Sequence, residues 1–287
     1  MTSQLLASTV DGLVIGIVYG VAAMGLTLIF GVMNVINLAH GPIITLGMFG
    51  VYLLFQNFGL NPFLALIAVA IAGLILGVVM YVIAVHRVID APHLSSLLAT
   101  FSVNMMIIGV ATTVFSTTPR NVDYSLGTFS LGPISLTYTR LAAAGLAAVI
   151  TSGLYFFLYR TRQGRYVRAV ANNRKAAELM GIPSARVLGL SFGLGTMLAA
   201  VAGGLIATFL PFTVLAGGTY ELKSFVIVVL GGLGNPLGAL IGGIILGAME
   251  GVIPVFLEVT WVAVLEFLLF VLILVVMPTG LLGRRSR

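Results

Sequence analysis

The 287-residue sequence is poor in charge and contains no cysteine. Only 8% of its residues are Asp, Glu, Lys or Arg, whereas 60% are hydrophobic. An ordinary soluble domain carries about 25% charged residues to cover its surface. The composition therefore predicts an integral membrane protein. The absence of cysteine excludes disulfides and thiolate metal sites, but it does not identify a compartment.

The amino-terminal residues lack the features of a cleaved leader. MTSQLLASTV has no basic region, and no separate small-residue cleavage site precedes the first apolar run. We therefore expect no removable signal peptide.

Most of the chain consists of long apolar stretches. They cover approximately residues 11–33, 42–56, 62–85, 94–116, 139–159, 187–210, 222–252 and 255–277. A membrane-spanning helix needs about 20 residues, so the chain has room for about eight spans and for little else. We predict an all-α polytopic membrane protein, a bundle of about eight transmembrane helices that forms one membrane-spanning domain over residues 1–287.

Positive charge is concentrated in two places and predicts the topology. Seven cations against one acid lie between residues 160 and 186, and three arginines lie at the carboxyl end. Both clusters flank apolar runs, which is typical of cytoplasmic loops and disfavours nucleic acid as a partner. Five crossings before the 160–186 loop place the amino terminus on the other side, together with the weakly charged 117–138 connection. We expect ordered turns in that connection.

Two apolar regions are interrupted by helix-breaking residues. The 222–252 stretch contains four glycines and a proline between residues 231 and 238, and a Gly-Asn-His-Gly-Pro-rich segment covers residues 31–42. Residues 187–287 begin and end on the cytoplasmic side but hold three apolar stretches. We therefore predict that 222–252 is a re-entrant hairpin or two half-helices.

Broken helices at membrane depth indicate a pathway. They are tolerated where protein or a water-filled cavity satisfies the freed backbone groups, and corresponding breaks in the two halves of a transporter point to its binding site. A simple loop at each break is the alternative. The candidate pathway residues are Asn34, Asn37, His40, Gly41, Gly231, Gly232, Gly234, Asn235 and Gly238.

Glycines also recur at helical spacing elsewhere, which predicts close packing between helices. The rows are Gly12, Gly16 and Gly20, then Gly234, Gly238 and Gly242, then Gly243, Gly247 and Gly251.

Three segments carry a resemblance to a known family. DGLVIGIVYGVAAMGLTLIFGVMNVINLAHG, VLGGLGNPLGALIGG and VVMPTGLLG resemble the permeases of the branched-chain amino acid class of bacterial ABC importers, in particular the H-type subunit. The similarity covers essentially the whole chain. Leu38 stands where the family commonly has an aromatic residue, and Asn235 where serine is common.

The resemblance implies a working assembly in the bacterial inner (cytoplasmic) membrane, which the chain crosses many times. The expected partners are a second, M-type permease subunit, two cytoplasmic ATP-binding subunits and a periplasmic substrate-binding protein. The chain itself then catalyses nothing and needs no cofactor. Consistently, it has no GxxxxGK[ST] loop, no HExxH motif and no plausible Ser/His/Asp set.

Residues 164–187 are the most informative polar segment. Helix-favouring residues run from Tyr166 to Met180, Gly181 suits the left-handed conformation that ends a helix, and Pro183 prevents its resumption. We predict a short cytoplasmic helix. The resemblance implies that it is the coupling helix that docks on the ATPase, and a basic loop that only sets topology is the alternative. The positions carried over are Arg168, Ala169, Asn173, Ala177, Gly181 and Ile182.

Two ionisable residues leave alternatives open. His40 could contact the substrate or support the broken backbone, whereas metal binding is disfavoured because no other His, Cys or acid lies nearby in sequence. Glu266 falls near the middle of the last span, where it could be the titrating group of a proton-coupled carrier or a hydrogen-bonded group at a helix interface. Glu250 lies near a span end and is expected to reach water.

The sequence thus favours an ABC permease for branched-chain or other apolar amino acids with an apolar lumen. Amides, urea and small aromatic acids remain open as substrates. A self-sufficient proton-coupled secondary transporter, or a channel for small polar solutes, is the rival function, and a membrane scaffold without a pathway is a third.

Overall fold

The computed structural model describes residues 2–131, 134–277 and 279–283. The carboxyl-terminal arginines used for the topology prediction lie outside these ranges. Within them the elements are α1 (Thr2–Met33), α2 (His40–Phe58), α3 (Pro62–Met80), the π-helix η1 (Tyr81–Val85), α4 (His93–Phe115), β1 (Thr128–Leu131), β2 (Ile134–Thr137), α5 (Tyr138–Arg160), α6 (Arg162–Asn172), α7 (Arg174–Leu179), α8 (Ser184–Ala207), α9 (Ala216–Gly231), α10 (Pro236–Phe256) and α11 (Thr260–Val276).

The described helices confirm an all-α polytopic membrane protein. Seven of them are long and apolar enough to cross a membrane, namely α1, α2, α3 with η1, α4, α5, α8 and α10. The remaining apolar helices are shorter, with 16 residues in α9 and 17 in α11. The long helices α1 and α8 are the most buried of the spans and form the centre of the bundle.

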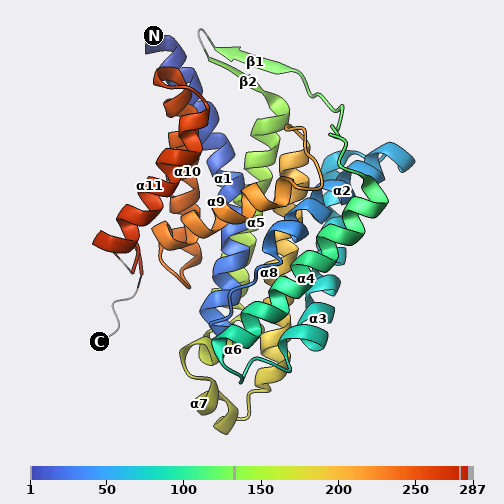
Figure 1. Ribbon diagram of the computed structural model, residues 1–287, viewed down its shortest axis with the longest axis vertical. Helices are drawn as coiled ribbons and strands as arrows, with labels where there is room; N and C mark the ends of the chain where they lie inside the picture. Colours follow the sequence, from blue (N-terminus) through green and yellow to red (C-terminus); the bar gives the residue numbers. More distant parts are fainter. Residues whose placement is uncertain (1, 132–133, 278, 284–287) are drawn as a thin grey trace.

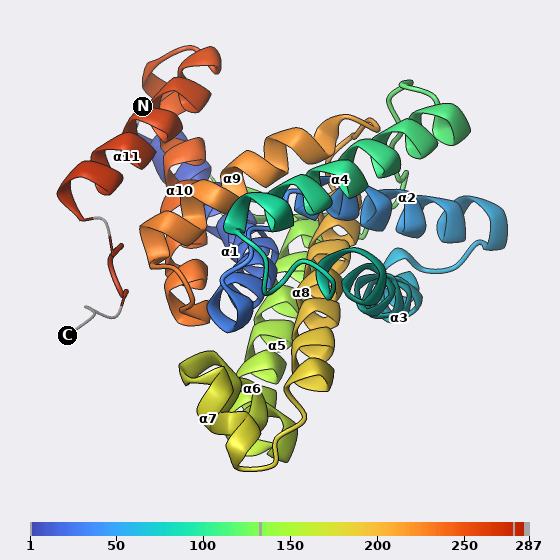
Figure 2. The ribbon, with the colours of Figure 1, turned by 60° about the horizontal axis from the view of Figure 1, so that its bottom comes forward.

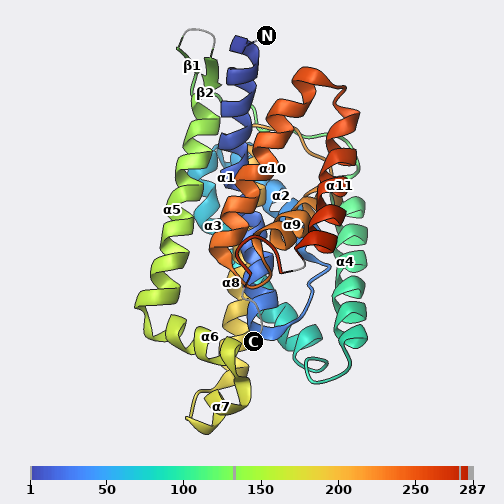
Figure 3. The same ribbon diagram turned by 90° about the vertical axis from the view of Figure 1, so that its left-hand side faces the viewer.

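The two ends of the bundle differ in character (Figures 1 and 3). The strands β1 and β2 lie at one end beside the amino terminus, and α6 and α7 lie at the other, with α5 running between them. This arrangement agrees with the prediction that the 117–138 and 160–186 segments face opposite sides. Instead of turns alone, the 117–138 connection holds an antiparallel hairpin that pairs Thr128 with Thr137.

Glycine rows bring α1 and α10 into backbone contact, as predicted. A methyl group added to Gly12 would lie 2.2 Å from the Gly247 carbonyl oxygen, and one added to Gly16 would lie 2.6 Å from that of Gly243. Only glycine permits this approach, which lets the two backbones touch along several turns. The amino-terminal helix is therefore fixed against the carboxyl-terminal half of the chain.

The 222–252 region is broken, as predicted, but its second piece is long enough to span a membrane and is not a half-helix. The first piece, α9, begins six residues earlier, at Ala216, and runs across the bundle in Figure 1. The second piece, α10, has 21 residues and is long enough to span. Asn235 explains where α10 begins, because its side chain accepts the Leu237 and Gly238 amides and Pro236 occupies the first turn.

The predicted cytoplasmic helix is two helices rather than one. The break falls at Asn173, whose extended backbone ends α6 and whose side chain accepts the Ala176 amide at the start of α7. An asparagine that caps a new helix competes with continuation of the old one. Gly181 has φ +78°, so the left-handed helix end was predicted correctly.

Candidate permeation site

The two predicted helix breaks lie side by side, although about 200 residues separate them. A methyl group added to Gly31, at the end of α1, would lie 2.8 Å from Gly234 Cα in the α9–α10 turn. A methyl group added to Gly41, at the start of α2, would lie 2.4 Å from the Gly217 carbonyl oxygen in the first turn of α9. The first break therefore contacts both ends of α9.

The non-helical segment 34–39 obtains several of its hydrogen bonds from α4. The Thr100 hydroxyl lies 3.2 Å from the Ile36 carbonyl oxygen and accepts the Leu38 amide at 3.3 Å. The Asn104 side-chain amide donates to the Leu38 carbonyl oxygen. Protein groups thus satisfy a broken backbone in the apolar part of the molecule. Ser96, Thr100 and Asn104 recur every four residues in an apolar span, a signal that would have identified this polar stripe.

His40 and Asn37 support the backbone and do not line a cavity. Both are completely buried. His40 Nε2 lies 3.0 Å from the Ala22 carbonyl oxygen, which assigns the proton to that nitrogen. Asn37 Oδ1 accepts the Ala39 amide at 3.1 Å. His40 Nδ1 and Asn37 Nδ2 have no hydrogen-bond partner in the part of the chain that the structure describes. This geometry favours the structural interpretation of His40 over substrate contact.

The remaining predicted pathway glycines form the α9–α10 turn. Gly232 and Gly234 have φ values of +100° and +81°, which side chains with a Cβ rarely adopt. A methyl group on Gly238 would lie 2.0 Å from the Gly231 carbonyl oxygen. Their role is to close the turn.

The segment after α11 returns to this turn and holds it. Leu281 donates its amide to the Leu230 carbonyl oxygen at 2.8 Å, and Asn235 Nδ2 donates to that of Leu282 at 3.0 Å. A serine side chain at position 235 would be too short for this second contact.

An apolar cavity of about 390 Å³ lies where the two breaks meet. Its wall contains only apolar side chains, from the end of α1, the 34–39 segment, α9, the α9–α10 turn and α11. The lining residues are Leu26, Phe30, Ile36, Leu222, Phe225, Val226, Val228, Val229, Leu233, Phe267 and Phe270.

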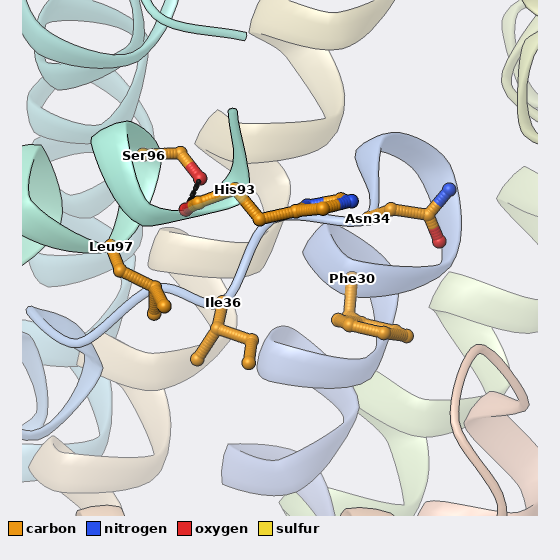
Figure 4. Close-up of a pocket in the computed structure, with 6 residues that line it drawn as sticks. All are labelled: Phe30, Asn34, Ile36, His93, Ser96 and Leu97. Atoms are coloured by element: carbon orange, nitrogen blue, oxygen red, sulfur yellow. Dashed lines mark hydrogen bonds between the residues drawn. The ribbon is translucent and has the colours of Figure 1, made fainter. Parts of the chain in front are cut away.

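A second cavity of about 350 Å³ adjoins the first and has a more polar wall (Figure 4). It lies between the end of α1 and the start of α4 and is lined by Phe30, Asn34, Ile36, His93, Ser96 and Leu97. Asn34 has φ +52°, a left-handed conformation that asparagine tolerates better than most residues. Of the predicted pathway residues, only Asn34 lines either cavity. The other lining residues were missed, because nothing distinguishes them from ordinary apolar or helix-start residues.

Charged groups lie on the side of α9 that faces away from the apolar cavity. Lys223 forms an ion pair with Glu250 of α10, and its Nζ lies 5.0 Å from the centre of the Tyr19 ring. Glu250 therefore has a charged partner within the chain, while 19% of its side chain remains exposed. Glu266 on α11 is buried, and its Oε1 has no hydrogen-bond partner among the described residues.

The helices α6 and α7 present an exposed tip at the far end of the bundle. Arg168 stacks over the Tyr159 ring at 4.6 Å. Ala177 is buried inside its own chain, and Ala169 and Ile182 are half-buried, so they offer little surface to a partner. Leu179 and Met180, which the sequence analysis did not single out, are 88% and 83% exposed. Two large apolar side chains at the end of a polar helix are the signal that was missed.

Ion pairs connect this tip to the rest of the chain. Arg174 contacts Asp90, in the segment before α4, at 2.8 Å and Glu178 at 3.2 Å. The Ser184 hydroxyl donates to Glu178, and with Arg174 it lowers the pKa of that carboxyl. The carboxylate therefore stays ionised at neutral pH.

Comparison with known proteins identifies a family. Residues 8–277 match the model of the branched-chain amino acid transport system permease component family. The permease LivH of Escherichia coli K12, from a high-affinity branched-chain amino acid transport system, is 32% identical over 96% of this chain and 94% of its own. The corresponding permease BraD of Pseudomonas aeruginosa is 28% identical over 97% and 96%.

One solved structure shows a similar fold. PsaBC of Streptococcus pneumoniae, in complex with a Fab, matches with a TM-score of 0.50 and 16% identity, over 94% of this chain and 91% of its own.

Proposed function

Because this chain belongs to the branched-chain amino acid transport permease family, we propose that it forms half of the substrate pathway of an ABC importer for branched-chain or other apolar amino acids. The whole chain, residues 1–287, acts as one membrane-spanning domain. A second, M-type permease subunit supplies the other half of the pathway.

The apolar cavity determines the substrate specificity. No charged or polar side chain lines it, so urea or a small amide would lose its hydrogen bonds to water without replacement. An aliphatic side chain gains about 25 cal/mol for each Å² of apolar surface removed from water. The adjoining cavity offers polar groups from Asn34, His93 and Ser96. An apolar body with a small, overall neutral polar end fits this pair of cavities.

The α6–α7 tip supports coupling to partner ATPases. Leu179 and Met180 are large, exposed and apolar, and such side chains act as anchors when a partner groove encloses them. We propose that two cytoplasmic ATP-binding subunits drive transport, one of them docking on this tip. A periplasmic binding protein delivers the substrate at the hairpin end. The assembly then lies in a bacterial inner membrane, and this chain carries out no catalysis itself.

A transport assay tests this proposal. Proteoliposomes that hold the chain with its partner permease, ATPases and binding protein should accumulate radiolabelled leucine only when ATP is present. Unlabelled valine and isoleucine should compete, and urea should not. Competition by urea alone would contradict the assignment of apolar amino acids.

A proton-coupled carrier is the second candidate, and the buried Glu266 carboxyl favours it. An intramembrane carboxyl without a full set of partners is a common proton site in carriers. The Lys223–Glu250 pair on the neighbouring helices supplies further charge. None of these groups lines the apolar cavity, however, so a proton taken up there would have no direct contact with the substrate.

A further inference from the structure

Phe30 and Ile36 separate the two cavities. They are the two residues that line both the apolar cavity and the more polar one, and Figure 4 shows their side chains from the polar side. Phe30 lies in the last turn of α1, and Ile36 lies in the non-helical segment that follows it. A molecule that moves directly from the apolar cavity to the polar one therefore passes these two side chains.

The polar cavity faces the α6–α7 end of the bundle. Its wall is built from the end of α1 and the start of α4, and in Figures 1 and 3 both of these ends point toward α6 and α7. By the distribution of positive charge, this end is the cytoplasmic one. The two side chains therefore stand between the lumen and the cytoplasm.

The two side chains are held by different parts of the molecule. Phe30 belongs to α1, which the glycine contacts join to α10. The Ile36 backbone is tied to α4 through the Thr100 hydroxyl. Whereas α1 is among the most buried spans, α4 is among the least buried and crosses over α2 at the periphery of the bundle (Figure 2). A shift of α4 would thus move Ile36 relative to Phe30.

The cytoplasmic end of α4 is in turn linked to the helix tip. Asp90, three residues before His93 at the start of α4, pairs with Arg174 of α7 at 2.8 Å. Asp90 and Arg174 are 77% and 33% exposed, so this pair adds little to stability. It does give α7 a direct contact through which a displacement can reach α4.

We propose that Phe30 and Ile36 form the inner gate of the pathway, and that α4 opens it by carrying Ile36 away when α7 moves. This inference rests on the proposed function, because a gate requires a pathway. The two apolar side chains keep the substrate from leaking while no ATP is bound, and the α7–Asp90–α4 connection makes their separation dependent on the ATPases.

A leak assay tests the gate. Proteoliposomes with the chain and its partner permease are loaded with radiolabelled leucine, and efflux is followed without ATP. Because a minor open state is typically populated at about 0.1–10%, Phe30→Ala should raise the leak by about tenfold or more. Ile36→Ala should act in the same direction. Phe156→Ala is the matched control, since Phe156 lies on α5, is 66% exposed and lines neither cavity, and this variant should leak no faster than the wild type.

A charge exchange tests the connection to α7. In the complete complex, Asp90→Arg should allow ATP hydrolysis with several-fold less leucine uptake, and adding Arg174→Asp should restore uptake. Failure of the double variant to recover would show that α7 does not act through Asp90.

The results of these assays distinguish a failure of the gate proposal from a failure of the proposed function. If the wild-type complex takes up leucine but Phe30→Ala and Ile36→Ala leak no faster than Phe156→Ala, the gate is wrong and the proposed function stands. If the wild-type complex moves no leucine, the proposed function itself is wrong.

Discussion

At the scale of single residues, replacing Thr100 should lower the stability of the protein most clearly. It is buried, accepts the Leu38 amide and lies within hydrogen-bond distance of the Ile36 carbonyl oxygen, so it contacts the backbone on both sides of Asn37. Thr100→Val keeps the shape but leaves the Leu38 amide and the Ile36 carbonyl oxygen without that partner. A buried unsatisfied group costs about 1–3 kcal/mol, and these two groups are partly buried, so the stability should fall by less than two full penalties and the Tm of the protein in detergent should fall measurably.

Thr113→Val is the control for this change, because Thr113 lies on the same helix, is exposed, and bonds only within its own helix. An equal fall in Tm for both variants would show that the Thr100 hydrogen bonds contribute nothing specific.

Leu179 is the residue that should reveal the ATPase contact. Its side chain is exposed and touches little of its own chain, so Leu179→Ser should leave the fold intact. If it anchors the partner, the substitution should cost at least about 1 kcal/mol of binding. Leucine-stimulated ATP hydrolysis by the complex should then fall several-fold at limiting ATPase concentration.

Leu126, 45% exposed at the opposite end of the bundle, provides the comparison. Leu126→Ser should leave the hydrolysis rate unchanged. A result in which both variants, or neither, lower the rate would remove the support for docking at the α7 tip.

At the scale of elements, the α1–α10 contact should be the least tolerant of added bulk. Gly16→Leu would force a side chain into a space where even a methyl group lies 2.6 Å from the Gly243 carbonyl oxygen. Overpacking typically costs about 1–3 kcal/mol, and here it would separate two helices. We expect a lower Tm and less protein in the membrane.

Gly153→Leu on α5 is the matched control for this contact, because nothing lies within 4 Å of an added Cβ there. It should be tolerated. Normal stability of Gly16→Leu would contradict the close backbone packing.

Helix breaks were the elements that sequence reasoning located best. Gly, Pro and Asn disfavour helix for reasons local to the chain, so the non-helical residues 34–39 and the turn after Gly231 could be found without tertiary information. The start of α9 at Ala216 could not, since Gly217 and Gly218 suggest a loop. The break at Asn173 was missed because asparagine is tolerated inside a helix, and only its contact with the Ala176 amide shows that it begins a new one.

The site was less predictable than the fold. Segments rich in glycine and polar residues were correctly taken to be unusual, but most of their side chains serve the backbone. The cavity is lined instead by residues such as Phe30, Ile36 and Phe225. Their types occur throughout the sequence, and their common position depends on how α1, α9 and α11 come together.

At the scale of the whole molecule, the two ends of the bundle should face different sides of the membrane. The chain has no cysteine, so a single introduced thiol reports its own position. Ala176→Cys on α7 should resist a membrane-impermeant thiol reagent in intact cells and react after the membrane is opened. Thr117→Cys, in the connection before the hairpin, should react in intact cells. Labelling of Ala176→Cys from outside would reverse the proposed orientation.

The central claim is that this chain is the permease of an ATP-driven importer. Measuring which energy source drives uptake tests this claim most directly. Leucine uptake should be measured in two kinds of proteoliposome, one with the full complex and ATP, the other with this chain alone and a pH gradient. Each is prepared with the wild-type sequence and with Glu266→Gln. We predict that uptake requires the complex and ATP, and that Glu266→Gln retains it. Uptake by the chain alone that is driven by the pH gradient and lost in Glu266→Gln would contradict this account.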